Sequence, residues 1–124
     1  MTTSKKFTYR EGTTEPITIT LYDNDVAADI TDYDSVSIFL RSYDKSEQSE
    51  ASTEDDGITV TTPASGIITL DPTKLTKALK YSKGAYLGYI IVIDTEGLRT
   101  SFPSNGEFIV EMLERFSGDE EPVI

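Results

Sequence analysis

Short segments in which apolar and polar residues alternate one by one are the feature that most restricts the fold of this chain. Residues 17–22 read Ile-Thr-Ile-Thr-Leu-Tyr, and the same alternation runs through residues 35–42. A period of two places every second side chain on one face, which is typical of a half-buried β-strand. Turn-forming Asp, Asn, Gly and Pro residues separate these segments. The pattern therefore predicts an all-β fold.

The regular spacing of strands and turns indicates how the strands are arranged. We expect about seven or eight short strands, at residues 7–10, 17–22, 35–42, 57–61, 67–70, 85–94, 98–102 and 108–112. Many short strands with regular turns are typical of a two-sheet antiparallel β-sandwich. The cysteine pair and the tryptophan of antibody domains are absent, so we expect an immunoglobulin-like sandwich without them. The side chains expected in its core are Ile19, Leu21, Val36, Ile38, Leu40, Val60, Leu70, Tyr86, Ile90, Val92, Phe108 and Val110.

Two segments depart from the strand pattern. Residues 71–80 begin with Asp71 and Pro72 and place Leu75 and Leu79 four residues apart, which predicts one short helix. Residues 43–56 hold six acids and no aliphatic residue larger than alanine. Because such a segment has little to bury, we expect a long, mobile, solvated loop between two strands.

Length and composition limit what the chain can do. Its 124 residues suit a single domain, and it contains no histidine, cysteine or tryptophan. A Cys/His zinc site, a thiol nucleophile and a Ser-His-Asp triad are therefore excluded. The net charge of -11 repels nucleic acid and anionic lipid, so neither is an expected partner. We expect no enzymatic activity and no cofactor.

Acidic turns leave one alternative open, since carboxylate oxygens suit calcium. Five acids lie in two turns, but their spacing matches no EF-hand loop, and Asp is also a common turn residue. We assign no metal ligand. The acids concerned are Asp23, Asp25, Asp29, Asp32 and Asp34.

Aromatic and aliphatic residues that alternation or position places outside the core are candidates for an interface. The interface candidates are Phe7, Tyr9, Tyr22, Phe39, Tyr89, Phe116, Val123 and Ile124. Three of them fall in a polar C-terminal tail, residues 114–124, which follows the sandwich domain of residues 7–113. We expect residues 1–6 to be a flexible N-terminal lead, and they lack the apolar segment of a secretory signal.

The order of these segments resembles the N-terminal immunoglobulin-like domain of tailed-phage baseplate upper proteins. The resemblance covers about residues 7–113 and is carried by residues 12–23 (GTTEPITITLYD), 29–31 (DIT), 36–41 (VSIFLR), 66–70 (GIITL), 84–89 (GAYLGY), 99–103 (RTSFP) and 108–110 (FIV).

The resemblance implies a non-enzymatic structural protein of a tailed-phage virion, in the baseplate, in the tail or on the capsid surface. Such a protein acts through protein–protein interfaces with other virion proteins and with copies of itself. The alternative is a module on the virion surface that binds a receptor or a carbohydrate. That alternative needs exposed aromatic and amide side chains around a groove.

Overall fold

Short β-strands make up the regular structure of the protein. The computed structural model describes residues 6–115. Its strands are β1 (Lys6–Arg10), β2 (Ile17–Thr20), β3 (Tyr22–Asp23), β4 (Val26–Ala27), β5 (Tyr33–Ser42), β6 (Gln48–Ser52), β7 (Ile58–Thr62), β8 (Ile67–Leu70), β9 (Tyr86–Asp94), β10 (Arg99–Phe102) and β11 (Phe108–Leu113). Three single 3-10 turns are present, η1 (Pro63–Ser65), η2 (Pro72–Lys74) and η3 (Tyr81–Lys83). The expected all-β fold is confirmed. Within residues 6–115, no helix has the length and apolar character needed to cross a membrane.

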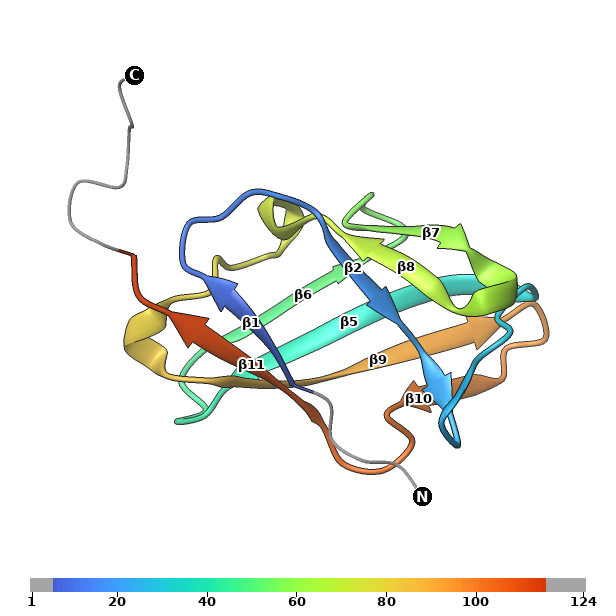
Figure 1. Cartoon of the computed structure of the whole chain (residues 1–124). Helices are drawn as coiled ribbons and strands as arrows, with labels where there is room; N and C mark the ends of the chain where they lie inside the picture. The colour runs from blue at the N-terminus through green and yellow to red at the C-terminus, as the bar shows by residue number, and fades with distance from the viewer. Residues whose placement is uncertain (1–5, 116–124) are drawn as a thin grey trace.

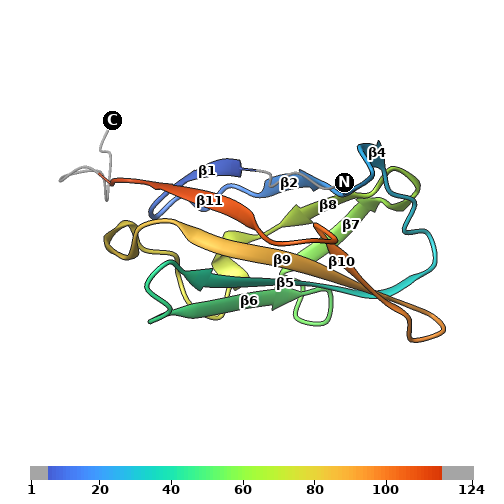
Figure 2. The same cartoon turned by 90° about the horizontal axis from the view of Figure 1, so that it is seen from below.

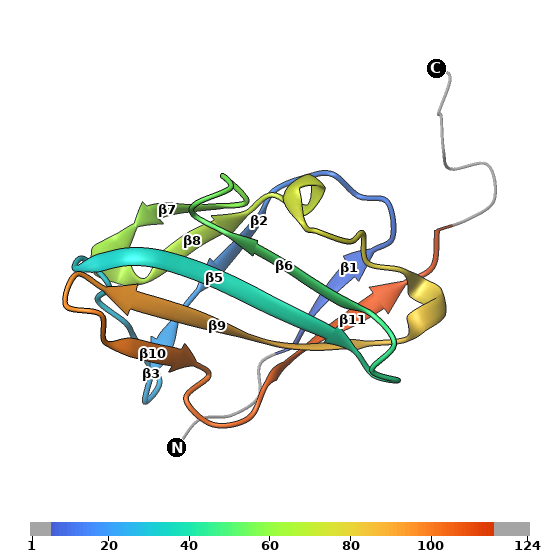
Figure 3. The same ribbon diagram turned by 180° about the vertical axis from the view of Figure 1, so that it is seen from behind.

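The strands form two main sheets that lie over one another. The larger sheet has the order β1-β11-β9-β5-β6, with β10 also paired to β9, and the smaller has the order β2-β8-β7. Figure 1 shows the smaller sheet across one face of β5 and β9, and Figure 2 shows the two layers from below. Figure 3 looks onto the other face of the larger sheet, where β6, β5, β9 and β10 lie in front. We call this the outer face.

One strand pair differs from the expected antiparallel arrangement. Strand β1 pairs with β11 in parallel, with Phe7 opposite Val110 and Tyr9 opposite Met112. After Arg10 the chain turns and passes to β2 in the other sheet instead of folding back beside β1. No hairpin therefore forces β1 to run antiparallel to its neighbour. The larger sheet is mixed, because this one pair is parallel and its other pairs are antiparallel.

The core fills the space between the two sheets and draws side chains from both. Val36, Ile38 and Val110 of the larger sheet and Ile68 of the smaller sheet are fully buried. All side chains expected in the core are buried except Ile19 and Val60, which are half-buried and pack against it. The alternation in the sequence therefore correctly identifies the inward face of the main strands.

Tyr86 closes the core near the start of β9. Its ring is buried, and its hydroxyl accepts a hydrogen bond of 3.2 Å from the backbone N–H of Lys80. Burial raises the pKa of this hydroxyl above its usual value. Two residues on, Gly88 leaves room for its neighbours, because a Cβ there would lie 2.5 Å from Leu40 Cδ2 and 3.0 Å from Phe108 Cζ.

The prediction of a long loop at residues 43–56 is wrong, because this segment contains strand β6. This strand pairs antiparallel with β5, with Leu40 opposite Ser49 and Ile38 opposite Ala51. Ser49 and Ala51 are buried on the inner face, while Gln48 and Glu50 are exposed. Small inward side chains suffice here because the backbone bonds to β5 supply the order that side-chain burial does not.

The expected helix at residues 71–80 is also wrong beyond its first turn. Asp71 caps η2 as expected, its carboxylate accepting from the N–H of Thr73 at 3.0 Å. Leu75 then adopts an extended conformation, and the chain continues beside β6. The N–H groups that a helix would pair internally bond to β6 instead: Thr76 to the carbonyl of Glu50 and Lys77 to the hydroxyl of Ser49. Leu75 and Leu79 are both buried without helical structure.

Candidate functional site

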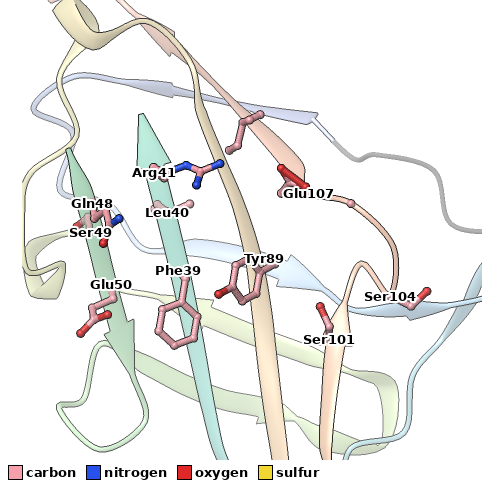
Figure 4. Close-up of a pocket in the computed structure, with 12 residues that line it drawn as sticks. Phe39, Leu40, Arg41, Gln48, Ser49, Glu50, Tyr89, Ser101, Ser104 and Glu107 are labelled. Atoms are coloured by element: carbon pink, nitrogen blue, oxygen red, sulfur yellow. The ribbon is translucent and has the colours of Figure 1, made fainter. Parts of the chain in front are cut away.

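A groove of about 570 Å³ crosses the outer face of the larger sheet. It is lined by β5, β6, β9, β10 and the connection from β10 to β11, and we call it the sheet groove. Figure 4 shows Phe39 and Tyr89 in its middle, between Glu50 of β6 on one side and Ser101 of β10 on the other. Most residues that line the groove lie on paired strands. The register of the sheet therefore decides which of these side chains are neighbours.

The centre of the sheet groove is a pair of stacked aromatic rings. Phe39 and Tyr89 lie directly opposite each other on β5 and β9. Their ring centroids are 5.3 Å apart and the ring planes make an angle of 29°. Cross-strand aromatic pairs stabilise a sheet and fix each other's orientation. Tyr89 still has 39% of its surface exposed, so the pair presents apolar surface to solvent.

Polar side chains surround this aromatic pair. Arg41 and Gln48 lie opposite each other on β5 and β6, Glu50 lies opposite Phe39, and Glu107 precedes β11. Among residues 6–115, the side chains of these four residues make no hydrogen bond or ion pair with one another or with other groups. They are therefore available to a ligand in the groove.

A second, smaller pocket of about 70 Å³ opens between β1, β2, β3 and the bend after β10. We call it the edge pocket. Its lining is mainly apolar and includes Phe7, Ile19, Tyr22, Phe102 and Phe108. The rings of Phe7 and Phe108 pack with their centroids 5.5 Å apart. Phe7, Ile19 and Tyr22 are partly exposed at its mouth, and buried core side chains such as Phe102 and Phe108 form the rest of its apolar lining.

Seven of the eight interface candidates from the sequence fall into three groups, and Tyr9 stands apart from them. Phe39 and Tyr89 line the sheet groove, and Phe7 and Tyr22 line the edge pocket. Phe39 lies on the outer face, where Tyr89 stacks on its ring, and its side chain is half-buried. Phe116, Val123 and Ile124 lie outside the described residues.

The prediction that Tyr9 is exposed is wrong, because its side chain is buried. Its ring packs in the core, and its hydroxyl donates a hydrogen bond of 2.5 Å to the carbonyl of Thr13. Burial, with a contribution from the nearby charge of Glu11, raises the pKa of the Tyr9 hydroxyl. The parallel pairing of β1 with β11 turns this side chain inward, opposite buried Met112.

The polar members of the sheet groove were not identified from the sequence. For Arg41 the sequence does carry a signal, because the alternation of residues 35–42 places it on the same face as Phe39. Gln48 and Glu50 fall in the segment expected to be a loop, where no face can be assigned. Their position beside the aromatic pair follows only from the pairing of β6 with β5.

Among the five acids of the acidic turns, Asp29 forms hydrogen bonds with a neighbour in its own turn. One carboxylate oxygen of Asp29 accepts from both the hydroxyl and the N–H of Thr31, which lowers the pKa of Asp29. In the part of the chain that the structure describes, no three acidic side chains gather closely enough to hold a metal ion.

Comparison with models of protein families, with curated proteins and with solved structures finds no match to this chain. The function must therefore be argued from the sequence and from the two surface features above.

Proposed function

We infer that the described strands form an immunoglobulin-like β-sandwich. In immunoglobulin domains, strands B, E and D are neighbours in one sheet, and G, F, C and C′ are neighbours in the other. The order β2-β8-β7 has the pattern of the first sheet, and the order β11-β9-β5-β6 has the pattern of the second. Strands β10 and β11 pair with successive parts of β9, so together they correspond to one interrupted strand G.

Tyr86 gives independent support for this correspondence. Immunoglobulin domains carry a tyrosine near the start of strand F whose hydroxyl bonds to the backbone a few residues upstream. Tyr86 has this position in β9 and bonds to the N–H of Lys80. That tyrosine precedes the second disulfide cysteine by two residues, and here the position is Gly88, with Leu40 and Phe108 packed against it.

On this fold we propose a non-enzymatic structural protein of a tailed-phage virion that works through contacts with other virion proteins and with its own copies. The resemblance of residues 7–113 to the N-terminal domain of baseplate upper proteins supports the assignment to a tailed-phage virion. The edge pocket is the observation that carries the mode of action. Part of its apolar lining, at Phe7, Ile19 and Tyr22, is open to solvent, and covering such surface is favourable by about 25 cal/mol per Å².

The volume and lining of the edge pocket indicate what kind of partner group can bind there. Its volume suits one small apolar side chain, since a cavity of about 150 Å³ already holds benzene. Asp25 lies at its border, so a basic residue beside the apolar anchor of the partner is complementary to this site. Apolar anchors that fill such pockets commonly dominate the binding energy of an interface.

Substitution at the mouth of the edge pocket tests the proposal. Tyr22→Glu introduces a charge beside the apolar lining, and Tyr81→Glu is the matched control, because Tyr81 is similarly exposed but lies outside the pocket. Phage carrying each variant are compared by immunogold electron microscopy. We expect wild type and Tyr81→Glu to label the particles and Tyr22→Glu to label them weakly, with unchanged thermal unfolding of the isolated variants.

Two results would overturn parts of this proposal. Absence of the wild-type chain from every particle contradicts a virion function. Normal incorporation of Tyr22→Glu contradicts docking through the edge pocket.

A further inference from the structure

The sheet groove is not used by the docking proposed above. No residue lines both the sheet groove and the edge pocket. An apolar side chain seated in the edge pocket therefore does not itself occupy the sheet groove. The sheet groove combines an aromatic surface with four polar side chains, those of Arg41, Gln48, Glu50 and Glu107, that make no hydrogen bond or ion pair within residues 6–115. This combination indicates a ligand with both apolar and polar surface.

We propose that the sheet groove binds an uncharged oligosaccharide. A sugar ring has an apolar face of C–H groups and a rim of hydroxyl groups. The exposed surface of Phe39 and Tyr89 can cover the C–H face of a sugar, as aromatic rings cover other apolar groups. Gln48 can both donate to and accept from hydroxyl groups, Arg41 donates, and Glu50 accepts.

The charges of the sheet groove favour an uncharged sugar. Arg41 contributes one positive charge, and Glu50 and Glu107 contribute two negative charges, so the groove itself is close to neutral. The whole chain carries a net charge of -11, which repels anionic sugars such as sialylated or phosphorylated glycans. The hydroxyl groups of an uncharged sugar can form hydrogen bonds with the charged and amide side chains and are not repelled by the net charge of the chain.

Size and hydration favour an oligosaccharide over a protein partner. The volume of about 570 Å³ lies within the range of small-ligand sites, about 300–1,000 Å³. A protein docked on this face would remove Arg41 and Glu50 from water, and each charge would then need its own partner. A sugar leaves the polar rim in contact with water, and bridging water then satisfies the remaining groups.

Binding measurements on the full chain test the inference. The probes are printed arrays of glucose, galactose and N-acetylglucosamine oligomers, beside sialylated and phosphorylated glycans, followed by calorimetry with the strongest soluble ligand. We expect at least one uncharged oligomer to bind with a Kd of about 1 mM or below. Tyr89→Ala should weaken this binding about tenfold or more, whereas Tyr89→Phe should retain most of it.

Tyr43→Ala is the matched control, because Tyr43 is 69% exposed and lies outside the sheet groove. Gln48→Ala should weaken binding less than Tyr89→Ala, since it removes hydrogen bonds but no stacking surface. Absence of binding to every uncharged oligomer, binding to anionic glycans alone, or equal loss in Tyr89→Ala and Tyr43→Ala each overturns the inference. None of these results bears on the incorporation of Tyr22→Glu into particles, so the two proposals can fail separately.

Discussion

The two central strands of the larger sheet and the pair of segments beside them reach order by different routes. Strands β5 and β9 carry alternating large side chains, and their inward residues Val36, Ile38 and Ile90 are almost fully buried. Strand β6 and the extended chain after η2 bury mainly small or widely spaced side chains. They are joined by hydrogen bonds, with Ser49 bonded to both the carbonyl and the N–H of Lys77.

Two segments that are each too weak to order alone can supply each other's hydrogen-bond partners. Residues 43–56 alone have too little apolar surface to order themselves. Residues 71–80 have a helical pattern that is too short to be stable alone. Side by side they satisfy each other's backbone groups, and the ion pairs of Glu47 with Lys77 and Lys80 lie at the same contact. The outcome is an extended pair instead of a loop and a helix.

The largest expected effect is at the centre of β5. Ile38→Ala removes a fully buried side chain and should lower the free energy of unfolding by about 2–5 kcal/mol, because the cavity can close only in part. Ile93→Ala, on the outer face of β9 and only half-buried, is the control and should cost clearly less. Denaturant unfolding of both variants measures the difference. Equal losses would mean that the inner face of β5 and β9 is not the main source of stability.

A smaller effect is expected where β6 meets the chain after η2. Ser49→Ala removes the buried hydroxyl that bonds to the N–H and carbonyl of Lys77, and should cost about 0.5–1.5 kcal/mol for each of the two bonds. Amide exchange should show faster exchange at Lys77 and little change in β9. Ser37→Ala is the control on β5, since its hydroxyl makes no hydrogen bond among residues 6–115. Unchanged protection at Lys77 in Ser49→Ala would show that the Ser49 hydroxyl does not hold the chain after η2 against β6.

The smallest effect concerns pH and the turn that leads from β5 to β6. The hydroxyl of Ser46, followed by the hydroxyl of Ser42 and the N–H of Ser46, holds the pKa of Asp44 well below its usual value. Between this lowered pKa and about 3.9, the unfolded chain binds more protons than the native one. The stabilisation is therefore present above about pH 4 and is lost as the pH falls through the native pKa.

Asp44→Asn tests this linkage. The variant should be less stable than wild type near neutral pH, and the two should converge as the pH falls below about 4. Thermal unfolding across this range measures the gap. A gap that stays constant down to the lowest pH at which the protein folds would show that the Asp44 carboxylate does not stabilise the turn.

The candidate site could be found only in part from the sequence. Alternation placed Phe39 and Tyr89 outside the core, and both line the sheet groove. The same reasoning failed for Tyr9, because its strand pairs in parallel with a strand far along the chain and turns this ring inward. Gln48 and Glu50 became part of the groove only through the partner of their strand.

The all-β class, the inward faces of β5, β8, β9 and β11, and turns such as the one closed by Gly66, whose φ of 65° suits glycine, all follow from the sequence alone. These features depend on side-chain period and on local backbone preference, both of which can be read from neighbouring residues. The tertiary structure alone decided the strand character of residues 48–52, the extended course of the chain after Leu75 and the direction of β1. Each of these depends on backbone hydrogen bonds between distant segments, which any sequence can form and which therefore leave no pattern in the residues.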